Sequence, residues 1–149
     1  MPDPRTTAHG SFLMPSLEHA TVGDAMHPGI LSCDPDATLT DVARIMATHH
    51  VHCVAVLGAS EEQSGPVACG IITDLDLVRA GIGDGSEATA RGLALEAIVV
   101  EASTPLREAA REMLTRKARH VVVADPVARR PVGVLSTLDV AGVLAWGEA

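Results

Sequence analysis

The sequence of 149 residues has almost no aromatic side chains, a single lysine and no long apolar run. Phe12 and Trp146 are its only aromatic residues, so the stacking platforms on which single-stranded nucleic acids bind are missing. Lys117 and the arginines number 11 against 19 acidic residues, and the net charge of −8 argues against a nucleic-acid surface. No stretch approaches the ~18 apolar residues of a membrane span, and the apolar run at Phe12 is too short for a secretory signal. The sequence therefore predicts a soluble cytoplasmic protein with neither a nucleic-acid nor a membrane partner.

Cysteine is also scarce. Cys33, Cys53 and Cys69 form an odd set without a closely spaced pair, which excludes a disulfide scaffold. Because 47% of the residues are hydrophobic, the core must be built mainly from aliphatic side chains. The length suits one compact domain, or two small ones that share a core.

An internal duplication organises the chain. Residues 30–57 align with residues 97–124 and, after a gap, residues 70–76 align with residues 133–139. Each copy predicts the order β-α-β-β-α, because an extended piece and an amphipathic helix are followed by two apolar runs and a second helix. One copy has too small a sheet to bury its own apolar face, so the two copies are expected to pack together in an α/β (α+β) fold. The apolar stripes of the first helices are Leu39, Val42, Ala43 and Met46, and Leu106, Ala109, Ala110 and Met113.

Local signals set the boundaries. Thr38 with Asp41 predicts a capping box, and Thr104 before Pro105 predicts an N-cap with proline at the first helical position. The glycine-rich segment 81–93 predicts a linker. The expected organisation is an N-terminal tail at 1–20, with Phe12 to Met14 able to dock on the body, a first repeat at 21–80 and a second at 94–147.

Each copy ends with the same motif. It consists of glycine, two apolar residues, serine or threonine and, three positions later, aspartate. Its polar members are Thr73 and Asp76 in the first copy, and Ser136 and Asp139 in the second. The glycine permits close approach of a ligand or a backbone. The hydroxyl caps a helix or binds an anion, and an ionised aspartate accepts hydrogen bonds from both hydroxyls of a ribose. A single copy is better explained as an ordinary capping box, but two copies in register favour a ligand site.

With these motifs the sequence resembles a tandem pair of CBS domains, the family named after cystathionine β-synthase. The resemblance runs from about Thr21 to Gly147 and includes the segments 22–26, 35–39 and 119–123. It implies two repeats packed about a pseudo-twofold axis, with two clefts that often bind AMP, ADP, ATP or S-adenosylmethionine, and further pairing into homodimers. The proline that the family often has in its second strand is replaced here by Ala55 and Val122.

The resemblance implies two candidate nucleotide sites. In one, Ser136 and Asp139 hold phosphate and ribose while Leu31, Val51 and His52 border the adenine; in the other, Thr73 and Asp76 act with Ile98, Ala118 and Arg119. His52, Arg119 and His120 lie near the expected phosphates. Since Arg119 is the only permanent cation in that set, the sequence favours AMP over ATP.

Other chemistry has weaker signals. His49, His50, His52 and Cys53 are metal-ligand types, but their spacing matches no standard four-ligand site. No catalytic motif is present, and no nucleophile lies beside an obvious base, so an enzyme is not expected. The predicted function is a stand-alone regulatory or sensor module that binds an adenosine nucleotide, needs no cofactor and acts through an unknown protein partner. The alternatives are a ligand-free dimeric interaction module, and a metal or redox sensor that uses His52 and the cysteines.

Overall fold

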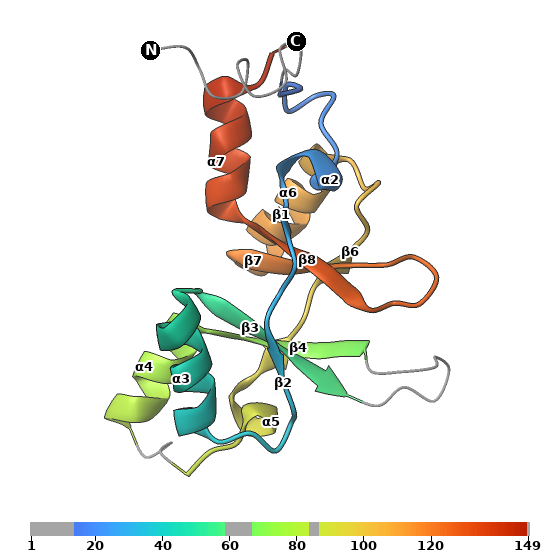
Figure 1. The fold of residues 1–149 in the computed structure, drawn as a ribbon. Coiled ribbons are helices and arrows are strands. Elements are labelled where there is room, and N and C mark those ends of the chain that lie inside the picture. The colour runs from blue at the N-terminus through green and yellow to red at the C-terminus, as the bar shows by residue number, and fades with distance from the viewer. Residues whose placement is uncertain (1–13, 59–66, 84–86, 149) are drawn as a thin grey trace.

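Two four-stranded sheets form the framework of the chain, and each is covered by its own helices (Figure 1). The computed structural model describes residues 14–58, 67–83 and 87–148. The first sheet has the strand order β2-β3-β4-β5 and the second the order β1-β8-β7-β6. The strands of the first sheet are β2 (Ser32–Cys33), β3 (Cys53–Gly58), β4 (Val67–Thr73) and β5 (Leu95–Glu96). Those of the second are β1 (His27–Pro28), β6 (Val99–Val100), β7 (His120–Ala124) and β8 (Pro131–Ser136).

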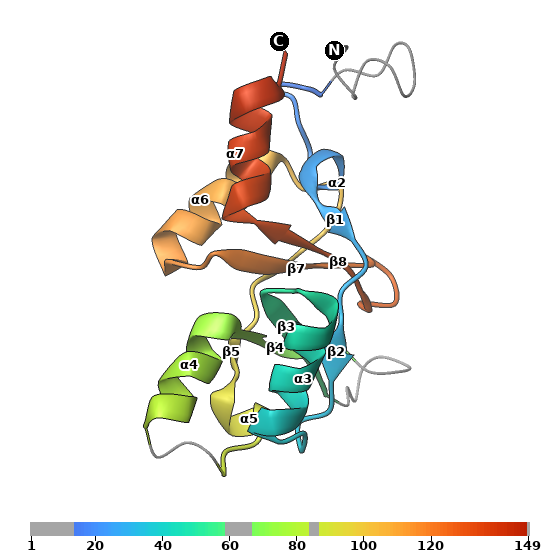
Figure 2. The same ribbon diagram turned by 60° about the vertical axis from the view of Figure 1, so that its left-hand side comes forward.

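Three helices accompany each sheet in the described part of the chain. Figures 1 and 2 show α3, α4 and α5 around the first sheet and α2, α6 and α7 around the second. The expected α/β class and its duplicated β-α-β-β-α order are confirmed, with short elements added before each copy. None of the described helices has both the length and the apolar character needed to cross a lipid bilayer. The helices are α2 (Val22–Ala25), α3 (Leu39–His49), α4 (Asp74–Ile82), α5 (Ala90–Leu93), α6 (Leu106–Arg116) and α7 (Thr137–Trp146).

The predicted helix starts are right in one case and wrong in the other. Thr38 and Asp41 form the expected capping box at the start of α3, each backbone N–H donating to the other side chain at 3.1 Å. At α6 the N-cap is Pro105 rather than Thr104. The Thr104 hydroxyl instead accepts a hydrogen bond from the Glu101 N–H at 3.2 Å, which closes the turn before the helix. A hydroxyl that is committed to the preceding turn cannot also cap the helix that follows.

The two halves exchange their edge strands. β1, near the start of the first repeat, pairs antiparallel with β8 of the second, and β5, near the start of the second repeat, pairs antiparallel with β4 of the first. The motif glycines permit this exchange. A Cβ atom on Gly133 would lie 2.6 Å from the His27 carbonyl oxygen, and one on Gly70 would lie 2.8 Å from the Ala94 Cβ atom. Both glycines therefore make room for a neighbouring strand, not for a ligand.

Each core also takes a residue from the exchanged segment. Val22 of α2 is fully buried with residues of the second half, such as Leu106 and Val121, whereas Ala90 of α5 is buried with Val42 and Val54 of the first. A third cluster joins the two sheets, and it contains Cys53, Ile71 and Val122. The sheets thus face each other across a narrow apolar contact, and the clefts lie at its sides.

The segments predicted as tail and linker contain ordered structure. The range 81–93 includes the end of α4 and all of α5. α5 is held in place because Ala90 is buried in the apolar core of the first half. Within the range 1–20, Met14 and Leu17 pack on the second core, and Ala20 is buried in it. Phe12 and Leu13, two of the three residues expected to dock, lie outside the described residues.

Candidate functional site

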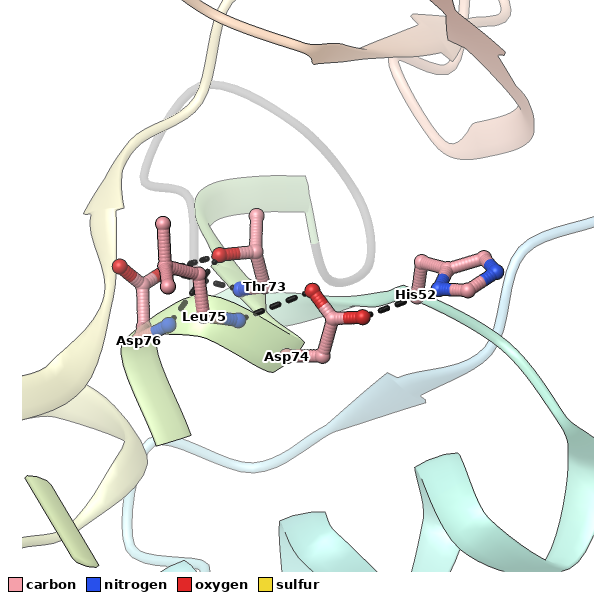
Figure 3. Close-up of polar contacts among 5 residues, drawn as sticks. All are labelled: His52, Thr73, Asp74, Leu75 and Asp76. Carbon is pink, nitrogen blue, oxygen red and sulfur yellow. Dashed lines mark hydrogen bonds and ion pairs between the residues drawn. The ribbon is translucent and has the colours of Figure 1, made fainter. Parts of the chain in front are cut away.

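The repeated motif forms a capping box at the start of α4 and of α7. Thr73 and Ser136 are the N-caps, and their hydroxyls accept from the N–H groups of Asp76 and Asp139 at 3.3 and 3.2 Å. In return, Oδ2 of Asp76 accepts from the backbone N–H and hydroxyl of Thr73, at 2.8 and 2.9 Å (Figure 3). The Oδ2 atom of Asp139 accepts the same pair from Ser136 at 2.7 and 3.0 Å. Capping thus occupies one oxygen of each carboxylate, and Oδ1 is the atom left for another partner.

A cleft of about 580 Å³, here called the Asp76 cleft, lies between the two repeats. Thr73 and Asp76 line it from the first repeat. The side chains expected from the second repeat, Ile98, Ala118 and Arg119, line it as well. The structure therefore brings this predicted set together, from elements far apart in the sequence.

The Asp76 cleft carries more positive charge than the sequence indicates. Besides Arg119 it is lined by Arg79, Arg116 and Lys117, against three acids, Asp74, Asp76 and Glu96. The Arg79 guanidinium lies 3.8 Å from Oδ1 of Asp76. The Arg116 guanidinium lies 3.8 Å from Glu96 and 3.6 Å from Glu112. Arg79, Arg116 and Lys117 were missed because their positions depend on where α4 and α6 end.

A second cleft of about 730 Å³, here called the Asp139 cleft, contains the other predicted set. Ser136 and Asp139 line it from the second repeat, and Leu31, Val51 and His52 line it from the first. None of the described residues lining it is lysine or arginine. Five of the seven histidines of the chain lie here instead, namely His27, His49, His50, His52 and His120.

His27 contacts the aspartate of this cleft directly. Its Nδ1 atom lies 2.8 Å from Oδ1 of Asp139, with the imidazole largely exposed and the carboxylate only 6% exposed. Both carboxylate oxygens of Asp139 are therefore engaged within the protein. Sequence reasoning missed His27, since β1 has only two residues and pairs with the other repeat.

Two histidines lie between the clefts and line both. His52 Nδ1 is 2.9 Å from Oδ2 of Asp74 (Figure 3), and this hydrogen bond is the main cause that lowers the pKa of Asp74. Burial lowers the pKa of His120, against the opposing influence of Asp74. In the described part of the chain, Nδ1 of His120 is a buried polar atom without a hydrogen-bond partner. His120 is thus mainly a neutral imidazole at neutral pH.

The metal and redox alternatives find little geometric support. Within the described ranges no three His, Cys, Asp or Glu side chains gather closely enough to hold a metal ion. Burial raises the pKa of the Cys53 thiol to about 11, with Asp74 adding to the shift, and burial also raises the pKa of Cys33. A thiol with a raised pKa is protonated at neutral pH and reacts slowly with oxidants.

Two equivalent α/β units, with a capped aspartate in each of two clefts between them, define a tandem-repeat module rather than a single-site domain. The family model for the CBS domain matches residues 22–83 and 94–145, and the chain belongs to this family. No functionally curated protein is significantly similar to it in sequence.

Solved structures of CBS domain pairs share the fold. The pair of protein MJ0100, in complex with 5′-methylthioadenosine and S-adenosyl-L-methionine, has a TM-score of 0.72 at 20% identity, covering 85% of this chain and 96% of that one. CBSX2 in complex with AMP has a TM-score of 0.71 at 22% identity, covering 85% and 97%. Hypoxic Response Protein I with two coordinated zinc ions has a TM-score of 0.67 at 28% identity, covering 83% and 98%. The first two likenesses show the fold alone.

Proposed function

We propose that the chain is a regulatory module that binds an adenosine nucleotide between its repeats. One observation carries the proposal: the Asp76 cleft combines a carboxylate oxygen not used in capping, apolar side chains and cations. Oδ1 of Asp76 accepts the ribose hydroxyls, Ile98 and Ala118 border the base, and Arg119 with Thr73 binds phosphate. In the Asp139 cleft, the corresponding residues are Asp139, Leu31, Val51, His52 and Ser136, with His120 between the two clefts.

Two CBS pairs of the same fold support the adenosine ligand, since one binds methylthioadenosine and S-adenosylmethionine and the other AMP. The preference for AMP over ATP rested on a shortage of cations. In the Asp76 cleft this reason does not hold, because Arg79, Arg116 and Lys117 join Arg119. The proposal therefore covers AMP, ADP and ATP. The relative affinities of the three nucleotides decide how many phosphates the preferred ligand has.

A ligand that contacts both repeats binds one arrangement of the two halves more tightly than another, and so it shifts the protein toward that arrangement. This shift is the regulatory signal. The module acts as a cytoplasmic homodimer that passes the signal to a protein partner, and it catalyses no reaction. Exposed apolar residues on α4 and α7 support the dimer, among them Val78, Ile82 and Leu144. Beyond Asp139, α7 contains only apolar residues and glycine, which is typical of a helix covered on several sides.

The test is thermal unfolding of the purified protein with AMP, ADP, ATP, NAD or S-adenosylmethionine. At about 1 mM, a ligand with a dissociation constant of about 10 µM adds roughly 2.7 kcal/mol to the folded state. This corresponds to a midpoint about 5–10 °C higher for a domain of this size. Ribose 5-phosphate serves as the control ligand without a base. No increase with any adenosine compound would contradict the proposal.

The second candidate is a ligand-free dimeric interaction module, and the capping geometry favours it. Asp76 and Asp139 each complete a helix N-terminus without any ligand, so their presence in the motif has a purely structural explanation. This candidate predicts a stable dimer with the same unfolding midpoint in the presence and absence of every nucleotide.

A further inference from the structure

The two clefts differ at the atom that matters most for a riboside. In the Asp139 cleft, Oδ1 of the aspartate lies 2.8 Å from Nδ1 of His27, at ion-pair distance, while Oδ2 accepts from the backbone N–H and hydroxyl of Ser136. Both carboxylate oxygens thus have a partner within the protein, and the side chain is 6% exposed. A ribose hydroxyl must therefore compete with the imidazole of His27 for Oδ1.

The equivalent position in the Asp76 cleft has no such group. His27 pairs with Val134 on β8, two residues before the N-cap Ser136. Leu95 pairs with Ile71 on β4, two residues before the N-cap Thr73. His27 and Leu95 therefore occupy equivalent positions in the two halves. Leucine offers no hydrogen bond to a carboxylate. Oδ1 of Asp76 instead lies 3.8 Å from the Arg79 guanidinium, beyond hydrogen-bonding distance.

The charges of the clefts differ in the same direction. Four permanent cations line the Asp76 cleft, whereas the described lining of the Asp139 cleft offers only imidazoles as bases. Phosphate is therefore attracted mainly to the Asp76 cleft, where the positive charges are permanent. The carboxylate contact and the distribution of cations are independent observations, and both favour the same cleft.

We propose that His27 is an internal latch that closes the Asp139 cleft to ribosides, so that the chain binds one nucleotide, in the Asp76 cleft. This inference rests on the proposed function and specifies its site. The imidazole is 73% exposed and belongs to a two-residue strand, so it turns into solvent without disturbing a core. Opening costs the contact of His27 with a nearly buried carboxylate, and we expect it to weaken binding in this cleft about tenfold or more.

Calorimetric titration with AMP tests the latch. The wild-type protein should bind one AMP per chain, Asp76→Ala should lose this binding, and Asp139→Ala should retain it. His27→Leu, which introduces the residue of the equivalent position, should add a second site. The matched reciprocal variant Leu95→His should weaken the first site about tenfold. Both positions are exposed, and a cooperative unfolding transition without ligand verifies that each of the two variants folds.

The outcomes separate the latch from the function on which it rests. Two equal sites in the wild-type protein, or a single site lost in Asp139→Ala and kept in Asp76→Ala, would overturn the latch and leave nucleotide binding intact. A single site in His27→Leu would overturn the role of His27 while the Asp76 assignment stands. No binding in any of the proteins would overturn the proposed function and the latch together.

Discussion

Replacing Asp76 by alanine separates its structural role from its proposed role in binding. In the unliganded protein the variant loses the two hydrogen bonds from Thr73 to Oδ2, at 2.8 and 2.9 Å. Loss of such a cap costs about 1 kcal/mol of the free energy of unfolding, or about 3 °C in the unfolding midpoint. The midpoint measured without ligand therefore reports the capping role alone.

The effect on the ligand is larger. If Oδ1 of Asp76 accepts the ribose hydroxyls, its removal costs about 1.5–3 kcal/mol of binding energy, because the lost acceptor is charged. An affinity about 10- to 100-fold lower reduces the stabilisation by AMP from about 2.7 kcal/mol to about 0.4–1.4 kcal/mol. Scanning fluorimetry with and without AMP measures this loss of about 1.3–2.3 kcal/mol, which is separate from the loss of about 1 kcal/mol from capping because it appears only when AMP is present.

Asp41→Ala is the matched control, since it removes the carboxylate that accepts a hydrogen bond from the Thr38 N–H at 3.1 Å in the capping box of α3. Asp41 lines neither the Asp76 nor the Asp139 cleft. Its removal should lower the unliganded midpoint but leave the stabilisation by AMP unchanged. If Asp76→Ala keeps the full stabilisation, or if Asp41→Ala loses it equally, Asp76 is a helix cap and nothing more.

Three further predictions follow from burial and exposure. Because burial lowers the pKa of His120, its imidazole binds a proton more readily in the unfolded chain than in the folded protein. The contribution of neutral His120 to the free energy of unfolding should therefore be fully present above about pH 6.5 and be lost as the pH falls through the folded-state pKa. Urea unfolding across this range should show a weaker dependence in His120→Gln. The double variant Val78→Glu/Leu144→Glu should convert a dimer to a monomer in light scattering, whereas Val127→Glu, at a more exposed turn position, should not. Cys53, with a pKa of about 11, should resist a thiol reagent until the protein unfolds; rapid labelling of the folded protein would contradict this assignment.

Local patterns in the sequence predicted most of the fold. The apolar stripes of α3 and α6 bury Val42, Met46, Leu106, Ala109 and Met113 as expected, because helical periodicity is a property of neighbouring residues. The [Ser/Thr]-x-x-Asp motif forms a capping box in both copies, an interpretation that the sequence offered beside the ligand site, since every contact in it spans three residues. Such signals involve only residues that lie three or four positions apart in the sequence.

What the sequence did not predict depends on distant contacts. A two-residue strand such as β1 has too few positions to show an alternating pattern, and its partner lies in the other repeat. The contact between His27 and Asp139 therefore had no local signal. The cations at the end of α6, Arg116 and Lys117, were missed for a related reason, because only the packing of the repeats directs a helix end toward a cleft. The nucleotide-binding roles of the predicted site residues remain predictions until they are tested.

The exchange of β1 and β5 makes the two halves one thermodynamic unit. If the first half unfolds, the second sheet loses its pairing with β1 and the second core loses Val22; if the second half unfolds, the first core loses Ala90. Neither half is a complete folding unit when it is cut out at the boundaries of its sequence repeat. A ligand bound in a single cleft would therefore raise the free energy of unfolding of the entire chain.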